Sequence, residues 1–165
     1  MIGTKSSESR ENGTMVEVTG PNRFHRVGET DSPAGFEHDG VERSFVVHVP
    51  PSFDNTSALP LVLNFHGATS TKEGQESLSQ MDVKADEEGF IVAYPRGMNA
   101  LDLGRASSAP LTRSWNAGLC CGDAYLAGVD DVAFVDELLR LVSERLCVDR
   151  RRIFATGFSN GGYLT

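Results

Sequence analysis

The stretch RIFATGFSNGGYLT, residues 152–165, contains the strongest local pattern in the sequence. Its first six residues have the apolar character of a β-strand, and the GYL segment after it opens a helix. Between them GFSNG fits the pattern G-x-S-x-G, in which a serine stands on a sharp strand-to-helix turn with its hydroxyl exposed. Gly157 and Gly161 suit this turn because strand and helix approach too closely for a Cβ. The stretch therefore predicts Ser159 as a nucleophile.

Negative charge that forms beside Ser159 would need backbone N–H donors, and two segments can supply them. The N–H of Asn160 opens the helix after the nucleophile, where helix N-termini favour anions. The segment NFHGAT follows an earlier apolar strand and offers the N–H of Gly67 or Ala68. His66 in that segment is interpreted as a residue whose hydrogen bonds fix the loop, with substrate contact as the functional alternative and the base role disfavoured.

The rest of the chain alternates between strand and helix patterns. A turn at Asp39-Gly40 precedes an alternating strand with Phe45, Val47 and Val49 on one face and Val46 on the other. The next expected elements are a strand at 61–67, a helix within 69–89 that ends at Gly89, a strand at 90–97 and a loop at 98–128. A helix at 129–146 and a strand at 152–157 follow. The first helix has Leu78, Met81 and Ala85 at helical spacing, and the second has one apolar stripe: Val132, Val135, Leu138, Leu139, Val142 and Leu146. This order predicts an α/β sheet, mostly parallel, with ligands at the carboxyl ends of its strands.

The loop at 98–128 carries the segment RSWNAGLCCG, and long loops of compact domains are often functional. Trp115 within it is interpreted either as a residue that lines the substrate pocket or as an anchor of the loop, with neither reading favoured. Asp130 and Asp131 follow at the start of a helix, where we expect them to cap its N-terminus rather than to act as a catalytic acid.

Composition excludes several classes of function. The 165 residues carry a net charge of −8, which disfavours a nucleic-acid surface, and the basic run DRRRI at 149–153 is interpreted as a solvated loop. We find no apolar run long enough for a membrane span, no secretory signal, no metal-ligand spacing and no cofactor motif. Residues 1–30 are polar and aperiodic, so we expect them to be disordered or loosely attached to a domain over residues 31–165. The sequence leaves the oligomeric state open.

Several segments, in this order, resemble the secreted polyhydroxyalkanoate depolymerase and feruloyl esterase group of α/β-hydrolases: NFHGATS, VAYPRG, SWNAGLCCG, VDDVAFV and RIFATGFSNGGYL. The resemblance implies an α/β-hydrolase fold with helices on both faces of the sheet, and hydrolysis of polyester or of acyl esters on cell-wall sugars. It implies Ser159 as nucleophile and an extracellular location. Cys120 and Cys121 are then candidates for a disulfide that holds their loop to a cysteine in a further part of the protein.

One feature departs from the resemblance. In this fold the triad runs Ser, then Asp or Glu, then His, whereas all four histidines here precede Ser159. We therefore expect the sequence to be the N-terminal portion of a longer esterase, truncated after the nucleophile turn and inactive and poorly soluble alone. The alternatives are a chain without catalytic activity, which the absent acid and base favour, and a serine peptidase on the same fold, which the SWNAGLCCG segment disfavours.

Overall fold

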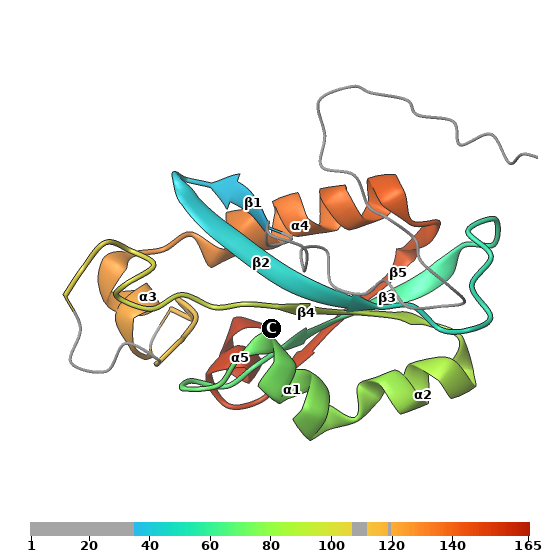
Figure 1. Ribbon diagram of the computed structural model, residues 1–165, viewed down its shortest axis with the longest axis horizontal. Coiled ribbons are helices and arrows are strands. Elements are labelled where there is room, and N and C mark those ends of the chain that lie inside the picture. The colour runs from blue at the N-terminus through green and yellow to red at the C-terminus, as the bar shows by residue number, and fades with distance from the viewer. Residues whose placement is uncertain (1–34, 107–111, 119) are drawn as a thin grey trace, which may run out of the picture.

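The computed structural model describes residues 35–106, 112–118 and 120–165, so the expectation for residues 1–30 lies outside the described residues. Its centre is one sheet of five strands in the order β1-β2-β4-β3-β5 (Figure 1). The strands are β1 (Gly35–His38), β2 (Val41–His48), β3 (Leu59–Phe65), β4 (Ile91–Pro95) and β5 (Val148–Gly157). β3 runs parallel to both β4 and β5, while β2 is antiparallel to β1 and β4.

A two-residue turn joins β1 to β2, and β1 was not predicted from the sequence. Asp39 and Gly40 both have positive φ, at 52° and 74°, and His38 pairs with Val41 across the turn. Positive φ at both central positions matches the right-handed twist of a hairpin, and Asp-Gly accepts it readily. The alternation predicted for β2 is confirmed, because Phe45 and Val47 enter one core cluster and Val46 enters another.

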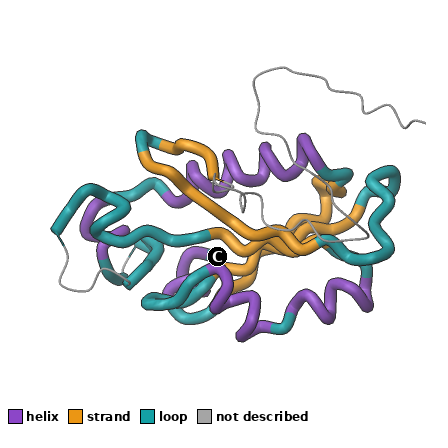
Figure 2. The backbone as a smooth tube through the Cα atoms, in the orientation of Figure 1, coloured by secondary structure: helices purple, strands orange, loops and turns teal. Residues whose placement is uncertain are grey.

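Helices cover both faces of the sheet, as Figures 1 and 2 show. One face carries α1 (Lys72–Ser79) and α2 (Met81–Glu88), and the other carries α4 (Asp131–Arg145). The prediction of one helix within 69–89 is wrong, because Gln80 takes a left-handed backbone with φ of 52° and separates α1 from α2. Leu78 is consequently exposed. Ala85 is buried, and Gly89 ends α2 as expected.

α4 packs its apolar stripe against the larger core cluster. Phe134, Leu138 and Val142, four residues apart, are its buried apolar positions, whereas Val132 is exposed. The predicted stripe is confirmed except at its first position, because Leu138, Val142 and Leu146 are buried and Val135 and Leu139 pack against the cluster, whereas Phe134 is buried in place of Val132. The cluster contains residues from β2, β3, β4, α4 and the loop around Trp115: Phe45, Val47, Val49, Leu61, Leu63, Phe65, Ile91, Ala93, Trp115, Phe134, Leu138, Val142 and Leu146.

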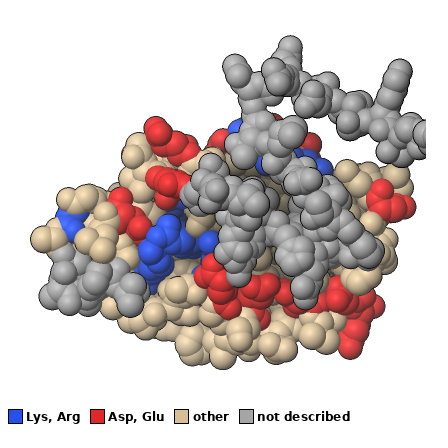
Figure 3. Space-filling model, viewed as in Figure 1, with Lys and Arg blue, Asp and Glu red and all other residues tan. Residues whose placement is uncertain are grey.

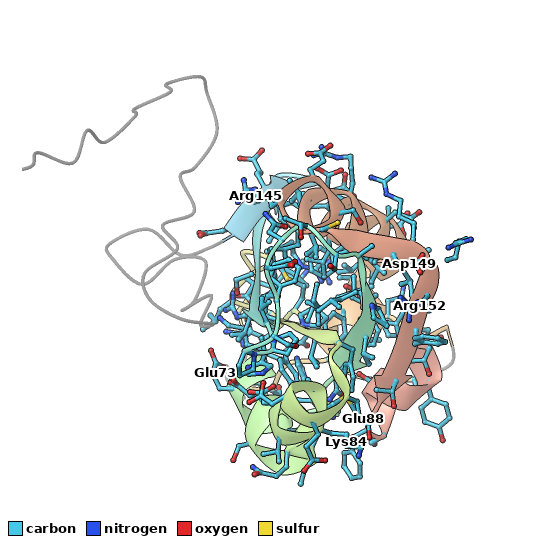
Figure 4. The ribbon with its side chains drawn as sticks, turned by 90° about the vertical axis from the view of Figure 1, so that its right-hand side faces the viewer. Glu73, Lys84, Glu88, Arg145, Asp149 and Arg152 are labelled. Atoms are coloured by element: carbon cyan, nitrogen blue, oxygen red, sulfur yellow. A yellow bond between two sulfur atoms is a disulfide. The ribbon has the colours of Figure 1, made fainter. Side chains whose placement is uncertain are left out.

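β5 lies at the edge of the sheet and begins earlier than predicted. The run at 149–153, expected as a loop, is part of the strand. Its charges stay on the surface, where Arg152 Nε donates to Asp149 Oδ2 at 2.8 Å (Figure 4). The prediction of a solvated charge cluster is confirmed, but the backbone of this run belongs to β5. The pairing of β5 with β3 changes register within it, between the pairs Leu59–Val148 and Leu61–Ile153.

The long loop between β4 and α4 contains more structure than expected. Met98 and Ser114 form an isolated antiparallel bridge, and α3 (Asp123–Ala127) is a short helix within the loop. Acidic side chains gather over α1 and α2, consistent with the net charge of −8 (Figure 3). Across the described ranges, no helix has the length and apolar character that a membrane crossing requires.

Candidate active site

Ser159 stands on the turn between β5 and α5 (Asn160–Leu164). Its backbone has φ of 49° and ψ of −118°, a conformation that costs energy for a residue with a Cβ. The turn is closed by Gly161, whose N–H donates to the carbonyl of Phe158 at 2.9 Å. The side chain of Ser159 is exposed, so its hydroxyl is accessible.

Two glycines allow strand and helix to approach at this turn. A Cβ on Gly157 would lie 2.5 Å from the carbonyl carbon of Gly161. A Cβ on Gly161 would lie 2.5 Å from the carbonyl oxygen of Phe65 at the end of β3. Real Cβ atoms do not make such contacts, so the turn and its seat against β3 both require glycine.

The loop after β3 lies directly beside Ser159. A Cβ on Gly67 would be 3.4 Å from the Cβ of Ser159. The following N–H groups of Thr69 and Ser70 donate to carbonyls of Arg113 and Gly67. In the part of the chain that the structure describes, no acceptor takes the N–H of Ala68 or of Asn160. These two donors are therefore free for a ligand.

His66 is buried and committed to the loop. Its Nε2 accepts the N–H of Gly97 at 2.9 Å, so Nδ1 carries the proton and donates to the carbonyl of Gly67 at 2.7 Å. Burial lowers the pKa of His66, which favours this neutral ring. With both ring nitrogens occupied, His66 has the arrangement of a loop-fixing residue.

Trp115 is fully buried, which is the arrangement of a loop anchor. Its indole Nε1 donates to the carbonyl of His66 at 2.9 Å. Its ring packs edge-on to Phe65 and parallel to Phe134. The sole tryptophan thus joins the long loop to β3 and α4 from inside the core.

The side chain of Asn160 also holds the long loop. Its side chain is buried, and its Oδ1 accepts the N–H of Trp115 at 2.7 Å. Its Nδ2 donates to the carbonyls of Trp115 and Cys120, both at 3.2 Å. The long loop is therefore hydrogen-bonded to the residue that follows Ser159. No local pattern signals this, because the partners are 40 or more residues apart.

The cysteines and the acidic pair differ partly from expectation. Cys120 and Cys121 are joined to each other in a disulfide, and Cys147 is a half-buried free thiol.

Asp130 caps α4 as predicted, since its Oδ1 accepts the N–H of Ala133. The capping prediction is wrong for Asp131, whose buried carboxylate pairs with Arg43 at 2.6 Å. Burial raises the pKa of Asp131, opposed by the Arg43 charge.

The hydroxyl of Ser159 has no basic partner in what the structure describes. Within residues 35–106, 112–118 and 120–165, no hydrogen bond joins it to a histidine or a carboxylate. The site thus combines an exposed serine on a strained turn with two free N–H donors. A serine hydroxyl needs a base to become a good nucleophile.

Comparisons with known proteins agree with this geometry. No family model matches the chain. Feruloyl esterase B of Piromyces equi is 35% identical over 120 residues, which are 73% of this chain and 20% of that protein. The bifunctional acetylxylan esterase/xylanase of Neocallimastix patriciarum is 27% identical over 126 residues, 76% of this chain and 16% of that protein. The solved structure of acetyl xylan esterase from Aspergillus awamori superposes with a TM-score of 0.52 at 20% identity, over 72% of this chain and 38% of that one.

The sequence-based resemblance and fold are thereby confirmed. The relatives of this chain are feruloyl esterases, acetylxylan esterases and related hydrolases, and its fold is that of α/β-hydrolase esterases. The chain spans one fifth or less of the length of the two relatives described here.

Proposed function

We propose that Ser159 is the nucleophile of a carboxylic ester hydrolase that works through an acyl-serine intermediate. The observation that carries the proposal is the backbone of Ser159, at φ of 49° and ψ of −118°, exposed between β5 and α5. Strain of this kind persists where the surrounding structure enforces it and is concentrated at functional sites. Here the close packing of the turn against β3, which leaves no room for a Cβ at Gly157 or Gly161, supports that interpretation.

The proposed chemistry follows from the groups around the serine. Ser159 Oγ attacks the ester carbonyl carbon, and the carbonyl oxygen takes up the negative charge. The N–H groups of Asn160 and Ala68, which have no described acceptor, then donate to that oxygen. Collapse of the intermediate expels the alcohol with the proton that Ser159 lost, and water later cleaves the acyl-serine bond.

Both steps need a base and an acid that the described residues do not bring to Ser159. The chain spans only a small part of the related feruloyl and acetylxylan esterases. We propose that these groups belong to a longer protein of which this chain is a part. Some catalysis would survive without them through binding and the oxyanion donors, but it would be slow.

The proposed substrates are acyl esters of cell-wall polysaccharides, feruloyl or acetyl, or a polyester. The names of the relatives, feruloyl esterase and acetylxylan esterase, support the first class. Because such polymers lie outside cells, we further propose that the longer protein is exported.

The competing proposal is a chain without catalytic activity, which the missing hydrogen bond from Ser159 to a base favours. A fluorophosphonate probe separates the two. We expect rapid labelling of the native protein from its source, an adduct on the peptide that contains Ser159, and hydrolysis of methyl ferulate or 4-nitrophenyl acetate that Ser159→Ala abolishes. A protein that hydrolyses these esters equally well with Ser159→Ala would refute the assignment, and one that neither reacts nor hydrolyses would support the non-catalytic alternative.

A further inference from the structure

A buried ion pair lies between β2 and the start of α4, away from the nucleophile turn. Arg43 Nη2 is 2.6 Å from Asp131 Oδ1, and the two side chains are 1% and 0% exposed. The guanidinium also lies 3.7 Å above the ring of Phe134, while its Nε has no described hydrogen-bond partner. Asp131 is not needed as a cap, because Asp130 caps the helix.

Stability alone does not account for this pair. Removing two charges from water costs about as much as their attraction returns, so apolar residues of similar volume often serve the fold equally well. The unpartnered Nε of Arg43 adds to that cost. The presence of the pair is therefore better explained by a function that requires its polar atoms.

The second oxygen of Asp131 supplies that role. Asp131 Oδ2 accepts the N–H of Asn116 at 2.7 Å, and Asn116 Nδ2 donates to the carbonyl of Val129. The next residue toward the N-terminus is Trp115, whose N–H donates to Asn160 Oδ1. A continuous set of hydrogen bonds thus runs from the ion pair through two adjacent loop residues to the residue after Ser159.

We propose that Arg43 and Asp131 are positioning residues for the nucleophile turn. Arg43 orients the Asp131 carboxylate, the carboxylate fixes the Trp115–Asn116 segment, and this segment holds the side chain of Asn160. The backbone N–H of Asn160 and the hydroxyl of Ser159 are thereby held in place. The inference rests on the proposed function for its purpose, but its structural content is independent of catalysis.

The test uses a double variant, Arg43→Met with Asp131→Leu, in the 165-residue chain. It removes both buried charges together, so no unpaired charge destabilises the fold, but it leaves the N–H of Asn116 without an acceptor. Asp130→Asn is the matched control, because asparagine also caps helices and the neighbouring carboxylate stays. Circular dichroism and the unfolding midpoint establish that each variant is folded, and Arg43→Lys with Asp131 retained serves as a second, milder variant.

Two readouts need no catalytic activity. Trp115 is the only tryptophan, so its emission wavelength and its quenching by acrylamide report on the loop. Amide exchange by NMR reports on Asn116 and on Gly161, whose N–H closes the nucleophile turn. We expect red-shifted, more readily quenched emission and exchange about tenfold faster or more at both amides in the double variant, with smaller changes in Arg43→Lys and none in Asp130→Asn.

A merely structural pair would loosen Asn116 and leave Gly161 protected, and that result in a folded variant overturns the proposal. In the longer, active protein we expect the double variant to lower kcat by about 10- to 100-fold with KM little changed. If the wild type proves inactive, the proposed function fails, while the exchange at Gly161 still decides the positioning role.

Discussion

β3 and β5 are parallel neighbours that carry the two halves of the candidate site, yet they lie in opposite environments. β3 runs between β4 and β5, and its inward residues Leu61, Leu63 and Phe65 are almost completely buried. Among the strands that the structure describes, β5 pairs with β3 alone, and Phe154 on it is 56% exposed. The strand that presents Ser159 is therefore not held by its own burial.

The end of β5 is instead held by contacts to β3. Phe158 N–H donates to the carbonyl of Phe65 at 3.0 Å, and Gly161 lies against the same carbonyl. The turn at Ser159 can thus be fixed by the buried strand beside it although the outer edge of β5 is open. β3 therefore supports the candidate site, and β5 presents Ser159.

The largest effect is expected from Leu63→Ala in β3. Leu63 is 2% exposed within the main core cluster, so its truncation removes apolar burial and leaves a cavity. We expect a loss of about 2–5 kcal/mol in the free energy of unfolding, measured by urea denaturation. A loss below about 1 kcal/mol would show that β3 is not the supporting strand.

A smaller effect is expected from Gly161→Ala at the contact between α5 and the end of β3. The new Cβ would lie 2.5 Å from the carbonyl oxygen of Phe65, and backbone atoms cannot yield as a flexible side chain can. We expect a loss of about 1–3 kcal/mol in unfolding free energy and slower probe labelling of Ser159.

Gly162→Ala is the matched control for that substitution, because its nearest neighbour, the carbonyl oxygen of Gly157, is 3.1 Å away. The gain in helix propensity offsets part of this tighter contact. Equal losses of unfolding free energy in the two variants would show that the effect arises within α5 and not from its contact with β3.

The free energy of unfolding should depend on pH through His66, which follows β3. The folded protein holds the ring neutral and burial lowers its pKa, so the unfolded chain binds this proton more readily. The contribution is therefore fully present above about pH 6.5 and is lost as pH falls toward the lower folded pKa. Urea unfolding of wild type and His66→Gln between about pH 7.5 and pH 5 measures this contribution. The wild type should lose its advantage in unfolding free energy over His66→Gln as pH falls. A constant difference would contradict the role given to the neutral ring.

The smallest effect is expected from Phe154→Thr on β5. Phe154 pairs in register with Val62 but faces outward and is more than half exposed, and threonine retains a preference for strands. We expect a change within about 0.5 kcal/mol by the same denaturation measurement. A loss comparable to that of Leu63→Ala would mean that another part of the protein covers this face.

Local patterns predicted much of the fold. The alternation in β2, the Asp39-Gly40 turn, β3, β4 and the strand-to-helix turn at Ser159 all follow from periodicity or from glycine. The break at Gln80 was missed because a left-handed non-glycine residue leaves no clear signal in the sequence. β1 was missed because four residues are too few for a periodicity to be recognised.

The sequence by itself determined where the strand-to-helix turn at Ser159 lies and which glycines permit it, because strand period, helix period and Cβ clashes act between residues close in the chain. Tertiary structure alone decided that Asp131 pairs with Arg43, 88 residues away, and that the side chain of Asn160 holds Trp115. Such partners are chosen by which buried polar groups the packing of β2, α4 and the loop brings within hydrogen-bond distance. Burial then makes each pairing necessary, since an unpaired polar group in the core is costly.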